Sequence, residues 1–154
     1  MRELKFRAVY KGDIELGKAL MFITKVIDFE LYFVMAGDED IRYPFSQVIM
    51  DDDWIKMQYT GLKDKNDKEI YEGDLIKSES FIKIRILDGE KLKEHSYEIS
   101  KVVFDMGAFK KIIVKQKNSW YAELPSPPMY IFSPEEYHRI IGNIHENPEL
   151  KGSD

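Results

Sequence analysis

Apolar and polar residues alternate with a period of two along much of the chain. Between residues 4 and 10, every second position carries an apolar side chain: Leu4, Phe6, Ala8 and Tyr10. Side chains of an extended strand point alternately to its two faces, so this period is typical of a strand with one buried face. Alternation, or runs of β-branched and aromatic residues, predicts further strands at residues 19–27, 29–35, 55–59, 70–71, 75–77, 81–87, 97–105 and 109–114.

Turn-forming residues separate these strands. Lys11-Gly12-Asp13 and Glu72-Gly73-Asp74 predict reversals, and Asp88-Gly89 is a strong signal for a two-residue hairpin loop. Residues 41–50 are expected to be extended, and Pro44 favours an edge position because proline cannot donate a hydrogen bond to a neighbouring strand.

One helix is expected, near the C-terminus. Ser133-Pro134-Glu135-Glu136 places a capping hydroxyl before a proline at the first helical position. Gly142 and the β-branched Ile140, Ile141 and Ile144 limit this helix to a turn or two, followed by a strand. The chain is therefore expected to be mainly β, with short strands forming a small SH3-like barrel or a bent sheet plus an N-terminal β region. We expect a single domain over residues 1–154, with lobes at 1–57 and 58–150 as a subdivision.

Composition narrows the class of protein. The 154 residues are 44% hydrophobic and 33% charged, with a net charge of −5, which argues against a dedicated polyanion-binding domain. Cysteine is absent, which excludes a disulfide, a thiolate nucleophile and a thiolate-ligated metal site. The longest apolar stretch, residues 19–35, is interrupted by four polar or charged residues, so no membrane-spanning helix is expected. With no apolar signal-peptide core at the start, we expect a cytoplasmic location.

No motif predicts catalysis, and neither a metal nor a cofactor is expected. The segment that starts at Asp64 resembles a calcium loop, but its fifth and sixth positions are Lys68 and Glu69 instead of an oxygen donor and glycine. His95, His138 and His145 lack the spacing of local zinc sites. An enzyme would require His138 or His145 to meet Glu72 or Asp74 in the folded chain, a hypothesis that the sequence leaves open.

A lysine-rich segment is the candidate for nucleic-acid binding. It contains four lysines without an acid and is followed by two aromatic residues: Lys110, Lys111, Lys115, Lys117, Trp120 and Tyr121. Lysines can neutralise phosphates while aromatic rings stack on unpaired bases. A solvated strand edge that prevents aggregation is the alternative, and this simpler interpretation is favoured.

The segment from Leu20 to Met35 is the candidate for an oligomer interface. Both faces of its predicted hairpin are apolar, and such a strand must be covered on both sides. A partner subunit or a two-layered monomer core could provide the cover, and both alternatives stay open. The candidate interface residues are Leu20, Phe22, Ile23, Phe29, Leu31 and Phe33. The leading hypothesis is a non-enzymatic protein that forms a homo-oligomer and binds a macromolecular partner, either another protein or a nucleic acid.

Three segments together resemble the YopX family, small proteins of temperate bacteriophages and prophages. They are the opening Leu4-Lys5-Phe6-Arg7-Ala8, the central motif from Gln58 to Asp64 and from Glu69 to Asp74, and residues 141–150. Two positions depart from the family pattern: Val9 stands where tryptophan is frequent, and Asn66-Asp67 stands where Asn-Gly is frequent. The resemblance implies a phage-related setting and a mainly β fold, and it implies no activity or catalytic residues.

Overall fold

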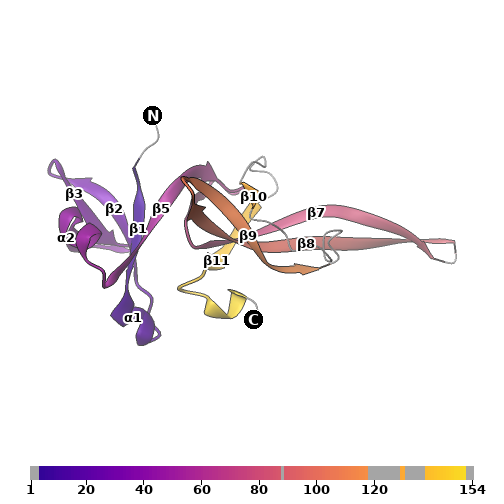
Figure 1. The fold of residues 1–154 in the computed structure, drawn as a ribbon, viewed down its shortest axis with the longest axis horizontal. Helices are drawn as coiled ribbons and strands as arrows, with labels where there is room; N and C mark the ends of the chain where they lie inside the picture. Colours follow the sequence, from indigo (N-terminus) through magenta and orange to yellow (C-terminus); the bar gives the residue numbers. More distant parts are fainter. Residues whose placement is uncertain (1–3, 88, 118–128, 131–137, 152–154) are drawn as a thin grey trace. The chain divides into compact units, whose positions relative to one another are not determined.

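The computed structural model describes residues 4–87, 89–117, 129–130 and 138–151, and these form a mainly β structure, as predicted (Figure 1). The chain divides into two compact units, unit 1 at Met1–Gly61 and unit 2 at Leu62–Asp154. The strands form two antiparallel sheets, and neither closes into a barrel within the described residues, so the bent-sheet form of the prediction holds. None of the helices in that part of the chain is long and apolar enough to cross a bilayer.

The first sheet has the strand order β4-β3-β2-β1-β5-β6. Its strands are β1 (Phe6–Tyr10), β2 (Met21–Ile27), β3 (Glu30–Met35), β4 (Asp38–Pro44), β5 (Trp54–Lys63) and β6 (Glu69–Tyr71). Two helices connect strands of this sheet: α1 (Lys11–Glu15) follows β1, and α2 (Phe45–Met50) follows β4. The core of unit 1 consists of Ala8, Phe22, Phe33, Val48 and Trp54. The Phe22 and Trp54 rings meet edge to face at 5.1 Å, a favourable aromatic geometry.

Two helices in unit 1 correct the predicted structure. Lys11-Gly12-Asp13, expected to be a turn only, begins α1, and the second half of the segment 41–50, expected to be extended, is α2. A helix brings residues three apart to one face, whereas a strand would send them to opposite faces. In α2 this spacing lets Val48 become fully buried while Phe45 stacks on Phe33 at 5.4 Å. Pro44, whose fixed φ suits a helix entrance, ends the exposed edge strand β4.

The second sheet, in unit 2, has the order β10-β9-β8-β7-β11. Its elements are β7 (Asp74–Leu87), β8 (Glu90–Asp105), β9 (Ala108–Lys117), β10 (Met129–Tyr130) and β11 (His138–Asn143), followed by the 3-10 helix η2 (Pro148–Lys151). The predicted hairpin is confirmed in its described part, because Leu87 pairs with Glu90 and Gly89 has a φ of 82°, while Asp88 lies outside the described residues. The predicted helix start at 133–136 lies outside the described residues, and the strand expected after it is β11.

The core of unit 2 lies on one face of this sheet. Ile70, Ile76, Val102 and Phe109 are buried there, with Leu62 and Ile140 packed against them. Gly73 joins β6 to β7 with a φ of 82°, a conformation that glycine adopts without a steric penalty, and its N–H donates to the Val102 carbonyl at 2.8 Å. The Glu72-Gly73-Asp74 reversal predicted from the sequence is therefore tied directly to β8.

Candidate functional site

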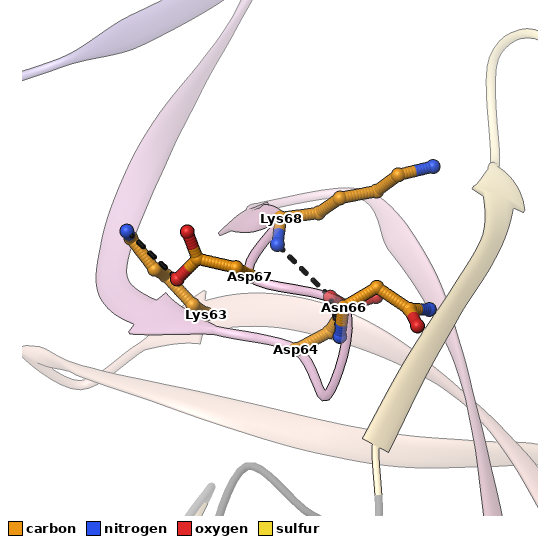
Figure 2. Close-up of polar contacts among 5 residues, drawn as sticks. All are labelled: Lys63, Asp64, Asn66, Asp67 and Lys68. Carbon is orange, nitrogen blue, oxygen red and sulfur yellow. Dashed lines mark hydrogen bonds and ion pairs between the residues drawn. The ribbon is translucent and has the colours of Figure 1, made fainter.

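The turn between β5 and β6, which resembled a calcium loop, is held together by one buried carboxylate. Asp64 Oδ1 accepts the N–H groups of Asn66 at 2.8 Å and Lys68 at 3.0 Å, and Figure 2 shows the carboxylate inside the turn. Asp67, at the position where the family often has glycine, takes a positive φ of 64° and forms an ion pair with Lys63.

The second oxygen of Asp64 reaches across to β11. Oδ2 accepts the N–H of Ile140 at 3.0 Å, and the Asp64 side chain is buried. Burial alone would raise the pKa of Asp64, but the three N–H donors and the Lys68 charge outweigh it, so this pKa lies below its usual value. The carboxylate is therefore engaged by backbone donors and has a structural role.

Asp74 has a similar role at the start of β7. Its Oδ2 accepts the Tyr71 N–H at 2.8 Å and its Oδ1 accepts the Asn143 side-chain amide at 3.2 Å. Asn143 Oδ1 in turn accepts the His145 N–H at 2.9 Å. These bonds join the central motif to the C-terminal motif, so the polar residues of both motifs hold the fold of unit 2 together.

His138 lies among structural groups as well. The register of β11 against β7 pairs His138 with Ser78 and pairs Asn143 with Asp74, which separates the histidine from that carboxylate along the strand. Burial, followed by the charge of Lys111, lowers the pKa of His138 to about 4, so the imidazole is neutral at pH 7. Among the described residues, no group of three or more histidine or acidic side chains could hold a metal ion.

The six candidate interface residues occupy three environments. Phe22 and Phe33 are buried in the core of unit 1, which satisfies them within one chain. Ile23 is partly exposed on the opposite face of the sheet, where it pairs with the buried Val34. Leu20 is exposed just before β2, whereas Phe29 and Leu31 lie at the far end of the β2–β3 hairpin and are also exposed.

The end of the β2–β3 hairpin carries an exposed apolar cluster that we call the hairpin patch: Val26, Phe29 and Leu31. Val26 pairs with Leu31 across the two strands, and their exposed fractions are 65% and 37%. Phe29 is fully exposed in the connecting turn. The Val26–Leu31 pair lies two residues beyond the Thr24–Phe33 pair, so both pairs point to the same face of the sheet. The patch therefore continues the core face outward.

The opposite face of the same hairpin end is charged. Lys25 forms an ion pair with Glu39, and the Tyr32 hydroxyl donates to Glu30 at 2.7 Å. The Arg42 guanidinium lies 5.1 Å from the centre of the Tyr32 ring. One face of the hairpin end is therefore apolar and exposed while the other carries solvated charges, an arrangement typical of an interaction surface.

The four lysines of β9 do not form one surface. Lys110 is nearly buried and its ammonium contacts Asp105 at 2.7 Å, while Lys111 is nearly buried near His138. Lys115 and Lys117 are exposed. Lys111 pairs with Val102 on the core face, whereas Lys115 pairs with Ile99 on the other face, because a bulge in β9 shifts the register between Ile113 and Lys115. Trp120 and Tyr121 lie outside the described residues.

Register places Lys115 and Lys117 on the same face of the sheet as cations from β7, β8 and β11. One row of paired residues crosses four strands. In it, Lys115 of β9 pairs with Ile99 of β8, Ile99 pairs with Lys77 of β7, and Lys77 pairs with Arg139 of β11. On one side of this row, Tyr97 lies between Lys117 and Glu79; on its other side, Lys101 lies opposite Leu75. We call this surface the basic face, and it consists of Lys77, Tyr97, Lys101, Lys115, Lys117 and Arg139. Sequence reasoning missed four of these residues, since alternation gives the face of a residue within its own strand but not the strand beside it.

Comparison with known proteins identifies a family and similar solved structures. The model of a family described as YopX protein matches residues 33–150. No curated protein matches the chain. Among solved structures, the chain is similar to the crystal structure of protein EF1440 from Enterococcus faecalis, with 20% identity, a TM-score of 0.44 and coverage of 98% of this chain and 99% of that one.

Proposed function

The chain belongs to the YopX protein family, and from this premise we propose that it is a non-enzymatic binding protein that self-associates through the hairpin patch. The family setting supports a protein of a temperate phage or prophage that acts in the cytoplasm of the bacterial host. The observation that carries the proposal is the apolar, exposed cluster of Val26, Phe29 and Leu31 at the end of the β2–β3 hairpin, whose opposite face carries the Lys25–Glu39 ion pair.

A second copy of the chain is the partner that fits this patch best. Two-fold association places the same surface of both copies in contact, so a self-complementary apolar patch is sufficient. Strand addition along the edge is less favourable, because edge strand β4 carries Asp38, Glu39 and Asp40 and ends at Pro44. Three apolar side chains form a small interface, so the dimer is expected to be weak and its population to depend on concentration.

Sedimentation velocity over a range of micromolar concentrations tests this function. The unmodified chain should shift from monomer to dimer as concentration rises, and the triple variant Val26→Thr, Phe29→Asn and Leu31→Thr should remain monomeric. A double variant, Leu16→Ser and Met50→Ser, is the matched control because these residues are also exposed and apolar but lie outside the patch. A strictly monomeric unmodified chain, or equal loss of the dimer in the control, would contradict the proposal.

A further inference from the structure

We propose a second function that goes beyond self-association: the basic face of unit 2 binds single-stranded nucleic acid. Five cationic side chains from four neighbouring strands share this face with one aromatic ring. Cations that neutralise phosphates, together with a ring on which bases stack, are the two parts of a surface that binds single strands without sequence preference.

The charge on this face is predominantly positive, although the chain as a whole is acidic. Between the registers of Lys101 and Lys117, Glu79 is the one acidic residue that the described strands place there, and it lies 3.7 Å from Lys77. In the described part of the chain, Lys101, Lys115, Lys117 and Arg139 form no ion pair. Four cations are therefore available to phosphates, and nearby positive charges favour binding of a polyanion.

Their spacing suits an extended strand. Neighbouring β-strands lie about 4.8 Å apart, so Arg139 and Lys115, separated by three such steps, are roughly 14 Å apart at the backbone. A nucleic-acid strand that crosses β11, β7, β8 and β9 would pass these side chains in turn. The cations on the face include both flexible lysines and a planar guanidinium, which can bind a phosphate through two hydrogen bonds.

Tyr97 favours a single strand over other polyanions. Its half-buried ring lies at one end of the basic face, directly opposite Lys117, with the Lys77 ammonium 4.8 Å from the ring centre. Bases can stack on such a ring only when they are unpaired, so a duplex gains nothing from it. An anionic membrane would favour exposed apolar side chains among the cations, whereas Ile99, which lies between Lys77 and Lys115, is buried.

Fluorescence anisotropy with a labelled oligothymidylate of about 12 nucleotides tests the proposal. At low salt the full-length chain should bind, and the logarithm of the binding constant should fall with the logarithm of salt concentration with a slope of about −3 if four phosphates are neutralised. The variant Lys115→Gln, Lys117→Gln should reduce the magnitude of this slope by about 1.4. The matched control is Lys11→Gln, Lys18→Gln, which removes two exposed lysines of unit 1 and should leave binding unchanged.

Two substitutions at Tyr97 test the stacking part. Tyr97→Phe keeps the ring and should retain the affinity, while Tyr97→Ala should weaken binding by about fivefold or more. The lysine variants change exposed side chains, so they keep the test decisive if Tyr97→Ala fails to fold. Absence of binding to oligothymidylate and to oligouridylate at low salt would overturn the proposal. So would equal weakening in the unit 1 control, or tighter binding to vesicles of phosphatidylserine and phosphatidylcholine than to the oligonucleotides.

Discussion

The carboxylate of Asp64 accepts a hydrogen bond from the backbone N–H of Ile140 at 3.0 Å, although the two residues lie 76 positions apart in the chain. The same side chain closes its own turn through Asn66 and Lys68. One buried acid therefore connects the β5–β6 turn to the last strand of unit 2, and the two segments are those that carry the family motifs.

Replacing Asp64 by asparagine should destabilise the protein substantially. Three backbone donors lose a charged acceptor, and one of them is left without a partner, so the free energy of unfolding at pH 7 should fall by about 3 kcal/mol. Urea denaturation measures this difference. Asp67→Asn is the matched control: this residue is exposed, and its ion pair with Lys63 should contribute less than about 1 kcal/mol.

The pH dependence of the Asp64 effect has a defined sign. The pKa of Asp64 is lower in the folded chain than in the unfolded chain, so its contribution is present above the ordinary carboxyl pKa and is lost as pH falls through the folded value. The difference in unfolding free energy between the unmodified chain and Asp64→Asn should therefore shrink below about pH 4. A constant difference down to pH 2 would contradict this assignment.

His138 should make the protein less stable in mild acid. Its pKa is about 4 in the folded chain, below the ordinary value, so the stability that it contributes is complete above about pH 6.5 and is lost as pH falls to 4. The loss over this interval should be about 3 kcal/mol. In His138→Gln the unfolding free energy should vary less over the same interval, and an identical pH profile in the two proteins would refute the prediction.

Gly142→Ala tests the packing of the C-terminal motif against β11. A Cβ at this position would lie 2.5 Å from Asn147 Oδ1 and 3.2 Å from Leu150 Cδ1. Asn147 Oδ1 also accepts the Asn143 N–H, so displacing it disrupts that bond. The thermal midpoint of unfolding should fall, and the free energy of unfolding should decrease by about 1–3 kcal/mol. The comparison variant is Ala108→Gly, which creates no clash. Gly107→Ala would not serve, because Gly107 has a positive φ that strains any side chain.

Phe29 should be unfavourable for the fold of its own hairpin. Asp28 and Phe29 both have a positive φ, 49° and 66°, in the two-residue turn between β2 and β3. Glycine adopts this conformation without the steric cost of a Cβ, so Phe29→Gly should raise the free energy of unfolding by about 1 kcal/mol. Phe29→Ala keeps the Cβ and removes the ring, and it should leave stability close to that of the unmodified chain. Equal stability of the two variants would contradict this account.

Much of the fold is predictable because alternation is a local property. The strands expected at 29–35, 97–105 and 109–114 correspond to β3, part of β8 and β9. Helix α2 was missed because it is short and directly follows a strand and Pro44. In so short a segment, apolar residues three apart are compatible with either a helix or a strand. Its helical form depends on packing against Phe33, a tertiary contact.

The surfaces were only partly predictable. Phe29 and Leu31 of the hairpin patch were named from the sequence, whereas Phe22 and Phe33 lie in the core, because the depth of a strand residue depends on which elements cover it. Lys111, Lys115 and Lys117 all occupy odd positions, so a regular strand would place them on one face. The structure separates Lys111 from the other two through a bulge that no local pattern indicates.

That bulge, a single extra residue at Val114, sets the side of the sheet on which the last two lysines of β9 emerge. If β9 continued from the Ile113–Ser100 pair without a bulge, with Val114 opposite Ile99, both ammonium groups would move toward the apolar interior and Gln116 would turn outward. Burial of two unpaired charges is far too costly for a fold of ordinary stability, so the strand would slip or the unit would not form. One inserted amino acid thus keeps the polarity of the two sides of β9 compatible with both solvent and core.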